Sequence, residues 1–576
     1  MAFLTLISSL LEGIGILFAM PLIQGIETSD GDISSDNKII ILLRSFLILL
    51  GINYTVINLL ITIAIIFLFK GFVSFATMYY NSFLRSQLLF TLKKKLFDGY
   101  TSMTYEYYSK RDTGHFVNII NGQIEGVMYG YQDLVRFVIQ IFSASVYLVF
   151  AFIVAWRFGI IVVILGGFLL LSFRFINRRV QKISRLKSGE GSYLNHMIIQ
   201  ILYSYKYLSS TSQVKILRDK VLSSISRLVN YQFKTDSASG LMQVAQEPIA
   251  ICFVCILMIT QIAYFDQPLG PILISILMFY RAFGAMMIMQ SNLQNTFSYS
   301  GNFEMVYNEF TSLSKNREIN GHLKVKSFNH SLKLLDVNYS YENNSDNVLN
   351  NLNITINVNT TIALIGESGS GKSTLVDIIT LVLKPNSGLI LVDGINAKDI
   401  DLDSWRKQIG YVSQEAVIFD DTIANNICLN TKESERDKVF IEKIIYAAKL
   451  ADLDDFINTL PSGYSTVVGE RGVRLSGGQR QRLFIAREIF RNPRVLILDE
   501  ATSALDSESE LSIQKSIDKL KGKVTVIIIA HRLSTIKNVD YVYLLHKGSI
   551  IEHGSYEQLK NLKTSKLNKL IDLQNI

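Results

Sequence analysis

The sequence predicts a polytopic α-helical membrane domain followed by an α/β domain with a largely parallel sheet. Long apolar runs, near the length needed to cross a bilayer, are concentrated in residues 1–290. Beyond about residue 330, short β-branched runs alternate with segments of helical spacing, which is typical of an α/β fold. Only 18% of the residues are charged and the mean hydropathy is +0.27, which argues against a wholly soluble protein.

Six candidate spans fall within the first predicted domain, residues 1–315. Long polar stretches separate the second span from the third and the fourth from the fifth. Within them, Phe90–Tyr100 and Ile199–Leu217 keep a helical spacing of apolar residues without breakers. We therefore expect the spans to continue as helices into the cytoplasm. The spans lie at about 3–26, 54–77, 135–156, 158–174, 247–265 and 269–290.

The positive charge of the chain indicates its orientation. The net charge of +8 lies entirely in residues 1–320, which hold 26 Lys and Arg and 18 Asp and Glu. The stretch 174–245 has 12 basic and three acidic residues, whereas 27–50 has two basic and four acidic ones. By the positive-inside rule the long basic loops are cytoplasmic and 27–50 is outside. Residues 321–576 hold 31 of each sign, so a nucleic-acid partner is not expected.

The second predicted domain, residues 331–576, follows a linker at about 316–330 and contains a phosphate-binding loop. The loop follows the apolar strand Ile362–Ile365 and opens a helix, the context in which this pattern binds nucleotides. Lys372 is expected to reach the β- and γ-phosphates and Ser373 to bind Mg²⁺, so ATP and Mg²⁺ are the predicted cofactors. The loop residues are Gly366, Glu367, Ser368, Gly369, Ser370, Gly371, Lys372, Ser373 and Thr374.

A second apolar strand, at 494–498, ends in two acidic residues. Asp499 is placed to hold Mg²⁺ through water, as the acid at the end of this strand does in P-loop enzymes. Glu500 follows directly and can polarise an attacking water as a general base. An acidic pair at a strand end is otherwise an ordinary solvated feature, so this prediction depends on the phosphate loop beside it.

The segment Leu475-Ser476-Gly477-Gly478-Gln479 precedes another helix and suits a second phosphate site. A second such site makes sense if it caps nucleotide that is bound to another copy of the chain. Here the sequence resembles the ATPases of ABC transporters, whose signature motif, phosphate loop and Asp-Glu strand have this order and spacing. Six spans followed by one nucleotide domain is similar to the layout of the exporter half-transporters of that family.

The resemblance implies roles for further residues. Tyr341 resembles the aromatic residue that stacks on adenine, and Gln414 resembles the Q-loop residue that senses Mg²⁺ and faces the membrane part. Asp506 ends a segment similar to the D-loop, which crosses the dimer interface. His531 resembles the switch histidine near the γ-phosphate. Glu470 lies in a segment that resembles the loop thought to contact the membrane domain.

One phosphate loop and one signature motif in each chain imply that two chains work together. ATP would lie between Lys372 of one copy and Ser476–Gln479 of the other. A homodimer is the simpler assembly, with a heterodimer as the alternative. ATP would close the two domains by its differential affinity for the closed state, and hydrolysis would release them. The resemblance places the segments that couple this motion to the spans near Tyr107–Gly114 and Leu202–Leu208.

Ionisable residues inside the spans are the candidates for substrate contact. Glu12, Lys70 and Arg281 either pair with each other or snorkel, or they line a cavity where Arg281 meets an anionic group such as a phosphate. The first span, the stretch 37–50 and Arg281 together resemble the bacterial lipid-linked oligosaccharide flippases of the ABC family. This resemblance implies an amphipathic lipid substrate, contact with membrane lipids, and a place in the bacterial inner membrane with the ATPase domain in the cytoplasm.

Other functions remain open from the sequence alone. A multidrug or peptide exporter would have the same layout of spans and nucleotide domain. An ATP-gated channel or regulator would carry the same motifs, and vectorial transport into vesicles would distinguish a pump from a channel. The six spans exclude the soluble ABC ATPases of DNA repair or translation.

Overall fold

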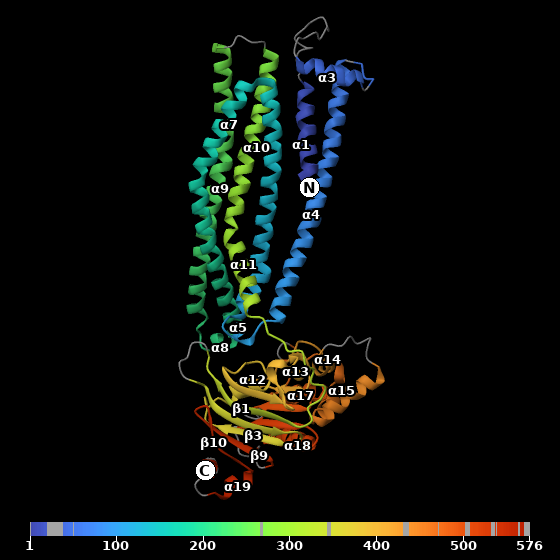
Figure 1. Cartoon of the computed structure of the whole chain (residues 1–576), viewed down its shortest axis with the longest axis vertical. Coiled ribbons are helices and arrows are strands. Elements are labelled where there is room, and N and C mark those ends of the chain that lie inside the picture. The colour runs from blue at the N-terminus through green and yellow to red at the C-terminus, as the bar shows by residue number, and fades with distance from the viewer. Residues whose placement is uncertain are drawn as a thin grey trace. The chain divides into compact units, whose positions relative to one another are not determined.

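The structure consists of two compact units, Met1–Arg317 and Glu318–Ile576, which are considered separately below (Figure 1). The predicted linker, 316–330, begins at this division. The computed structural model describes residues 2–19, 38–49, 51–53, 55–264, 269–341, 347–429, 437–469, 472–500, 507–530, 536, 538–562 and 565–568.

The first unit is built from long helices joined by short turns. The long helices are α1 (Ala2–Leu17), α3 (Lys38–Leu49), α4 (Val56–Thr101), α7 (Ile124–Tyr203), α9 (Val214–Tyr264), α10 (Leu269–Ser298) and α11 (Ser300–Lys315). The short elements are α5 (Tyr105–Ser109), α6 (Thr113–Asn118), a π-helical turn (Ile119–Gln123) and α8 (Tyr205–Ser210). The stretch 37–50, which contributes to the resemblance to the flippases, contains α3.

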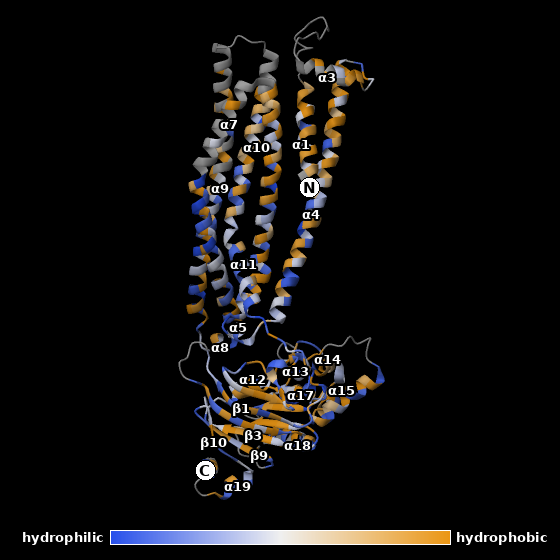
Figure 2. Cartoon of the chain, in the orientation of Figure 1, coloured by the Kyte–Doolittle hydropathy of each residue, from blue (hydrophilic) through white to orange (hydrophobic). Residues whose placement is uncertain are grey.

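Helix α4 shows how a span continues beyond the bilayer. It has 46 residues, which at 1.5 Å per residue gives about 69 Å, more than twice the ~30 Å hydrocarbon core. Figure 2 shows its apolar first part and its more polar last part. The segment Phe90–Tyr100 lies inside α4, as the apolar spacing predicted. Among the described residues, Val56–Thr101 and Thr113–Ile153 are long and apolar enough to cross a membrane.

Helix α7 contains the predicted third and fourth spans in one run of helix. Figure 1 shows its ribbon bending and turning back. Helix α10 packs against α7 through small residues, since Ala282 and Ala285 of α10 cluster with Ala144 and Tyr147 of α7. The side chains of 154–159, where the third predicted span meets the fourth, lie outside the described part of the chain.

The prediction of one continuous helix through Ile199–Leu217 is wrong. Helix α7 ends at Tyr203, the short α8 follows, and α9 begins only at Val214. Ser212 adopts a left-handed backbone conformation, with φ of 56°, between α8 and α9. The chain reverses direction here, and apolar spacing does not reveal a reversal because α8 keeps the helical period.

Helix α1 approaches its neighbours closely through two glycines. A Cβ at Gly13 would lie 2.3 Å from the ring of Phe150 on α7, and one at Gly15 would lie 2.8 Å from the ring of Phe67 on α4. Only glycine allows so short a separation. This packing holds Glu12, which precedes the first of these glycines, against both α4 and α7.

The second unit contains two sheets. A four-stranded antiparallel sheet has the order β2-β1-β4-β5, and a six-stranded sheet has the order β10-β9-β3-β8-β7-β6, parallel except for β10. The strands are β1 (Ser331–Tyr339), β2 (Leu349–Asn357), β3 (Thr361–Gly366), β4 (Ser387–Val392), β5 (Ile395–Asn396), β6 (Ile409–Val412), β7 (Val495–Asp499), β8 (Thr525–Ile529), β9 (Tyr541–His546) and β10 (Ser549–Gly554).

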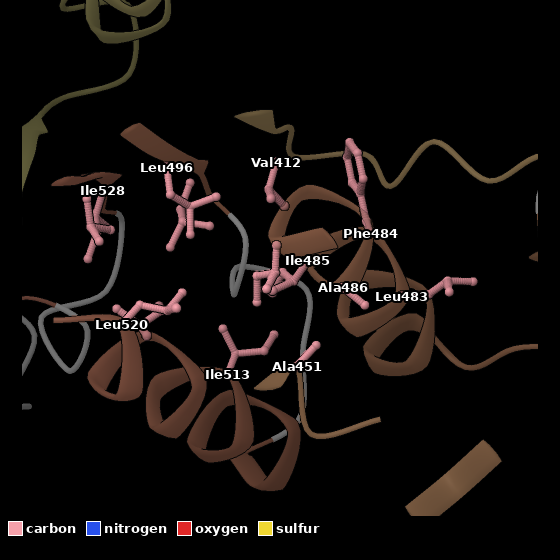
Figure 3. Packing of buried hydrophobic residues seen from close by; sticks show 14 of the residues in the cluster. Val412, Ala451, Leu483, Phe484, Ile485, Ala486, Leu496, Ile513, Leu520 and Ile528 are labelled. Carbon is pink, nitrogen blue, oxygen red and sulfur yellow. The ribbon is translucent and has the colours of Figure 1, made fainter. Parts of the chain in front are cut away.

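Helices cover the parallel sheet and complete the core of the second unit. Figure 3 shows side chains of α17 and α18 packing beneath strand residues such as Leu496 of β7 and Ile528 of β8. This buried cluster fixes the ends of the strands, and the functional residues follow those ends. The helices are α12 (Lys372–Ile379), α13 (Leu402–Arg406), α14 (Ile423–Cys428), α15 (Lys438–Leu450), α16 (Asp454–Thr459), α17 (Gly477–Phe490), α18 (Ser507–Leu520) and α19 (Tyr556–Asn561).

Candidate functional site

The loop Gly366–Thr374 connects the end of β3 to the start of α12. Gly369 and Gly371 have φ angles of 78° and 98°, which side-chain-bearing residues rarely adopt. A Cβ at Gly371 would also lie 2.7 Å from a side-chain carbon of Leu349. Gly371 is the N-cap of α12, so the backbone N–H groups of the loop meet the positive end of the helix. This geometry suits a bound phosphate chain.

Lys372 folds back over this loop. Its side chain is buried, and Nζ donates to the carbonyl oxygens of Gly366 at 2.8 Å and Glu367 at 2.9 Å. Burial lowers the pKa of Lys372, and the nearby negative charges of Glu500 and Asp499 oppose that shift. The ammonium group, the loop and the two acids therefore form one electrostatic site, in which phosphate oxygens can replace the loop carbonyls as partners.

Asp499 ends β7, and Glu500 follows it. The hydroxyl of Tyr411 on β6 donates to Oδ2 of the buried Asp499 at 3.0 Å. Glu500 has a φ of 49°, and its amide donates to the carbonyl oxygen of Ile529 at 3.3 Å. A left-handed conformation at a non-glycine residue stores strain of the kind found at functional sites. Nε2 of Gln414 donates to Oε2 of Glu500 at 2.7 Å, so these two predicted site residues are in contact.

Asp377 lies near the same acids, although no motif identifies it. Burial, and then the negative charge of Asp499, raise the pKa of Asp377 to about 6. The one sequence signal is its spacing: it follows Ser373 by four residues, one helical turn, and so shares that face of α12. Asp377 thus adds a proton-binding group to the acidic side of the site.

The residues at these strand ends fit a magnesium ion. The carboxylate of Asp499, the hydroxyl of Ser373 and the side-chain oxygen of Gln414 are hard oxygen ligands, and Mg²⁺ usually combines one or two carboxylates with phosphate oxygens and water. In the part of the chain that the structure describes, no group of three or more His, Cys, Asp or Glu could hold a metal ion. The ion therefore fits as the companion of a bound phosphate.

Tyr341 stands beside the end of the phosphate loop. Its hydroxyl lies 3.3 Å from Oγ1 of Thr374, and its ring packs edge-on against Tyr339 with 5.1 Å between centroids. The residue remains 41% exposed. An exposed ring next to the loop is available for stacking on a base.

Ser476–Gln479 begins α17 with a complete capping box. Oγ of Ser476 accepts from the amide of Gln479 at 3.2 Å, and Oε1 of Gln479 accepts from the amide of Ser476 at 2.8 Å. Ser476 and Gly477 are exposed, whereas Gly478 is buried. The predicted second phosphate site is therefore a rigid helix start that faces solvent in this chain.

Asp506 and His531 lie outside the described residues, as does Glu470. The strand that leads to His531 is described, however. It is β8, which pairs with β3 on one side and β7 on the other. The three strands that lead to the phosphate loop, to His531 and to Asp499 are thus adjacent and parallel, so their carboxyl ends meet at one edge of the sheet.

In the first unit, Glu12 lies between two cations. Its Oε2 accepts from Nζ of Lys70 at 2.6 Å, and its Oε1 lies 3.6 Å from Nη1 of Arg281. The three side chains line a cavity of about 420 Å³. The sequence leaves open whether these residues pair with one another or line a cavity. In the structure they do both.

The same cavity contains polar residues that the sequence patterns missed. These residues are Ser143 and Tyr147 of α7, and the lining also includes Glu247 of α9, an ionisable residue that the sequence places at the edge of the fifth span. Oγ of Ser143 lies 2.9 Å from Oγ of Ser9, and Tyr147 lines the cavity together with Glu12. Ser143 and Tyr147 are four residues apart within an apolar run, which places them on one helix face. That spacing was a usable signal for a polar stripe inside a span.

Comparison with known families identifies the chain. The profile of the ABC transporter transmembrane region matches residues 2–291, and the profile of the ABC transporter matches residues 349–503. The chain belongs to the ABC transporter family. The phosphate loop and the Asp499-Glu500 strand both fall inside the second match.

This ABC transporter is similar to curated proteins over most of its length. It is 33% identical to the heterocyst differentiation ATP-binding protein HepA of Nostoc sp., over 81% of this chain and 76% of that protein. It is 33% identical to the ATP-dependent lipid A-core flippase of Haemophilus ducreyi, over 87% of this chain and 86% of that protein. The flippase of the same name from Coxiella burnetii is 30% identical over 87% of this chain and 84% of its own length.

A solved structure shares the fold of this ABC transporter. The structure of a bacterial Atm1-family ABC exporter with ATP bound matches 100% of this chain and 99% of its own, with a TM-score of 0.79 and 22% identity. The predicted fold class, helical membrane domain followed by ATPase domain, is confirmed. The ABC transporter is an integral membrane protein of the exporter type, and it couples ATP hydrolysis to transport.

Proposed function

We propose that this ABC transporter works as a homodimer that moves an amphipathic, phosphate-bearing lipid, of the lipid-linked oligosaccharide type, across the bacterial inner membrane. The observation that carries the proposal is the charged cavity around Glu12 in the membrane unit. The names of several relatives, lipid A-core flippases, support a lipid as cargo.

Arg281 is the residue that we assign to the anionic group of the lipid. Glu12 already has a short contact with Lys70, at 2.6 Å, whereas Arg281 stands 3.6 Å away and is 52% exposed. The guanidinium group therefore keeps N–H donors for a ligand. Its planar fork matches phosphate oxygens well. Charged groups within a membrane span are costly, which supports a functional reason for keeping them there.

We assign the nucleotide chemistry to the strand ends of the second unit. When ATP and Mg²⁺ are bound, they supply the phosphate group and the cation that polarises it. Lys372 and the loop amides hold phosphate oxygens, Tyr341 stacks on the base, and Asp499, Ser373 and Gln414 provide oxygen ligands. Glu500 orients and deprotonates the attacking water, and His531 completes the site beside the γ-phosphate.

The partner copy supplies the second side of the nucleotide site. The exposed N-terminus of α17, with Ser476–Gln479, presents ordered backbone amides. Such a helix start favours negative charge. Two copies would then bind two nucleotides between Lys372 of one and Ser476 of the other, with Asp506 at the interface. A heterodimer with a related chain is the alternative assembly.

Reconstitution in liposomes tests the proposal. With ATP and Mg²⁺, the wild-type protein is expected to move a labelled polyprenyl-pyrophosphate oligosaccharide between leaflets, and Arg281→Gln is expected to lower that rate about tenfold. Basal ATPase activity of Arg281→Gln should stay near wild type, because the residue lies in the membrane unit. Glu500→Gln is the control for ATP dependence.

Two results would contradict the proposal. If ATP moves a drug or a phospholipid but not the labelled oligosaccharide lipid, the substrate assignment fails and the multidrug alternative stands. If ATP opens a passive ion conductance without vectorial transport, the protein is a gated channel. Crosslinking between single cysteines placed in the two copies at 370 and 477 would check the dimer independently of substrate.

A further inference from the structure

A second cavity in the first unit, separate from the one around Glu12, lies between α7 and α10. It has a volume of about 470 Å³. On α7, Arg174, Asn177 and Arg178 lie in the lining, spaced so that they share one helix face. On α10, Gln290 and residues one and two turns further along face the same space. Two helix faces thus enclose a pocket that the nucleotide chemistry does not use.

The two arginines give this cavity an unbalanced positive charge. No residue of its lining is acidic, and both Arg174 and Arg178 are exposed. Among the described residues, neither guanidinium has a carboxylate within 4 Å. Further along α7, by contrast, Arg185 pairs with Glu304 at 2.7 Å. Two unpaired guanidinium groups one helical turn apart attract an anion.

Two buried amides face the same cavity with unused hydrogen-bonding capacity. Asn177 is 7% exposed and Gln290 is 3% exposed. Within the described part of the chain, Oδ1 of Asn177 and Nε2 of Gln290 have no hydrogen-bond partner. A buried polar atom without a partner destabilises a fold, so each such atom needs an explanation. Together they offer a donor and an acceptor, the pair that a phosphate ester with a neighbouring hydroxyl would satisfy.

The sequence places this cavity at the cytoplasmic boundary of the bilayer. Three predicted spans have their cytoplasmic ends beside it: the third begins at 135, the fourth ends at 174 and the sixth ends at 290. The lining residues Phe137, Arg174 and Gln290 lie within two residues of those ends. Arg281, in contrast, lies nine residues before 290, or roughly 13 Å deeper along α10. The second cavity is therefore at headgroup level.

Apolar side chains complete the lining. Phe137, Leu293 and Phe297 face the cavity together with the arginines and amides. A free inorganic anion would gain nothing from these side chains, whereas a lipid would place the start of its acyl chains against them. The lining is thus amphipathic in the same sense as a lipid headgroup region.

We propose that this cavity binds the phosphate group of an anionic lipid of the cytoplasmic leaflet. Arg174 and Arg178 hold the phosphate oxygens, Nε2 of Gln290 donates to an ester oxygen, and Oδ1 of Asn177 accepts from a P–O–H group of the phosphate monoester. Basic pockets between membrane helices on the cytoplasmic side recognise anionic headgroups in this way. The proposal is independent of which molecule is transported, because no residue that lines this cavity also lines the cavity around Glu12.

Native mass spectrometry of the full-length protein in a neutral detergent tests the proposal. Dioleoyl phosphatidic acid is the probe, dioleoyl phosphatidylcholine is the lipid without net charge, and inorganic phosphate is the free anion. The double variant Arg174→Gln with Arg178→Gln is expected to bind phosphatidic acid at least about tenfold more weakly. Arg179→Gln is the matched control, because that guanidinium packs on Phe175 at 5.0 Å and does not line the cavity.

A second variant distinguishes ligand binding from structural support. Gln290→Leu removes a buried amide whose Nε2 has no partner, so the melting temperature should hold or rise while phosphatidic acid binding falls. A lower melting temperature with unchanged binding would overturn the proposal. Equal phosphatidic acid binding by the wild type and the double variant would also overturn it. Displacement of the lipid by millimolar inorganic phosphate would assign the cavity to a free anion instead.

Discussion

The nucleotide site of the second unit and the Glu12 cavity of the first unit are organised in opposite ways. At the nucleotide site, functional residues follow the ends of adjacent strands, so the backbone fixes each one and its local sequence reveals it. In the Glu12 cavity, polar residues come from different helices and hold one another. The comparison teaches that shared chemistry leaves local motifs, whereas the cavity that we assign to the cargo is marked in the sequence only by scattered charges.

The largest expected effect is at the strand ends. Glu500→Gln removes the proposed general base and is expected to lower ATP turnover by about 10²- to 10³-fold while ATP binding persists. A steady-state ATPase assay with the full-length protein in detergent measures the rate. Glu557→Gln, an exposed glutamate at the start of α19, is the control and should retain activity. Turnover near wild type in Glu500→Gln would remove Glu500 from the mechanism.

The second effect tests how the membrane cavity holds together. Lys70→Met leaves Glu12, only 13% exposed, with the more distant Arg281 as partner, and is expected to destabilise the protein by about 2 kcal/mol. Adding Glu12→Gln should recover much of that loss, because the unpaired carboxylate is then gone. A double-mutant cycle of unfolding measures the coupling. Strictly additive losses would mean that the contact contributes nothing.

The third effect is a pH dependence at Asp377. Its pKa is raised to about 6 from the ordinary 3.8, so the native state binds the proton more tightly than the unfolded state does. Ionised Asp377 therefore lowers the free energy of unfolding. This loss is absent below pH 3.8, grows between pH 3.8 and about 6, and is complete above about 6. Asp377→Asn should therefore stabilise the nucleotide-free protein by about 1–2 kcal/mol at pH 7.5 and by less at pH 4.5. Unfolding of the wild type and the variant is measured at both pH values. An equal gain in stability at pH 7.5 and pH 4.5 would mean that the gain does not come from ionisation of Asp377.

The smallest effect separates a helix cap from a nucleotide contact. Ser476 and Ser555 both form complete capping boxes, at the starts of α17 and α19. Each change to Ala is expected to cost about 1 kcal/mol of stability. Only Ser476→Ala should also lower ATPase activity, because only that helix start is assigned to the partner's nucleotide. Equal activity in the two variants would leave Ser476 as a cap alone.

These results show which parts of the molecule the sequence could predict. The strands before the phosphate loop and before Asp499 were predictable because apolar β-branched runs end in residues of fixed chemistry. Gln414 was assigned by resemblance, but its direct contact with Glu500 depends on a loop path that no periodicity encodes. Asp377 was missed because a lone carboxylate in a helix has no pattern. The break at Ser204 and the turn at Ser212 were missed because the apolar spacing continues through α8.

The residues that we propose for substrate contact are hard to predict for a related reason. Glu12, Lys70 and Arg281 were recognisable one by one as charges within apolar runs. Glu12 is separated in the sequence from Lys70 by 58 positions and from Arg281 by many more. Only the packing of the helices brings these three side chains together. The close approach of α1 through Gly13 is part of that packing, and the sequence alone does not indicate which neighbour the glycine faces.

The hydrogen bond from Gln414 to Glu500 has a consequence for how much ATP the cell spends on this transporter when no cargo is present. A carboxylate oxygen that already accepts a hydrogen bond from an amide has less capacity to accept one from an attacking water. While that bond persists, we expect ATP hydrolysis to be slow. The resemblance to ABC ATPases implies that Gln414 faces the membrane part, so we expect bound cargo to withdraw the amide and start hydrolysis. The bond would then couple ATP hydrolysis to the presence of cargo.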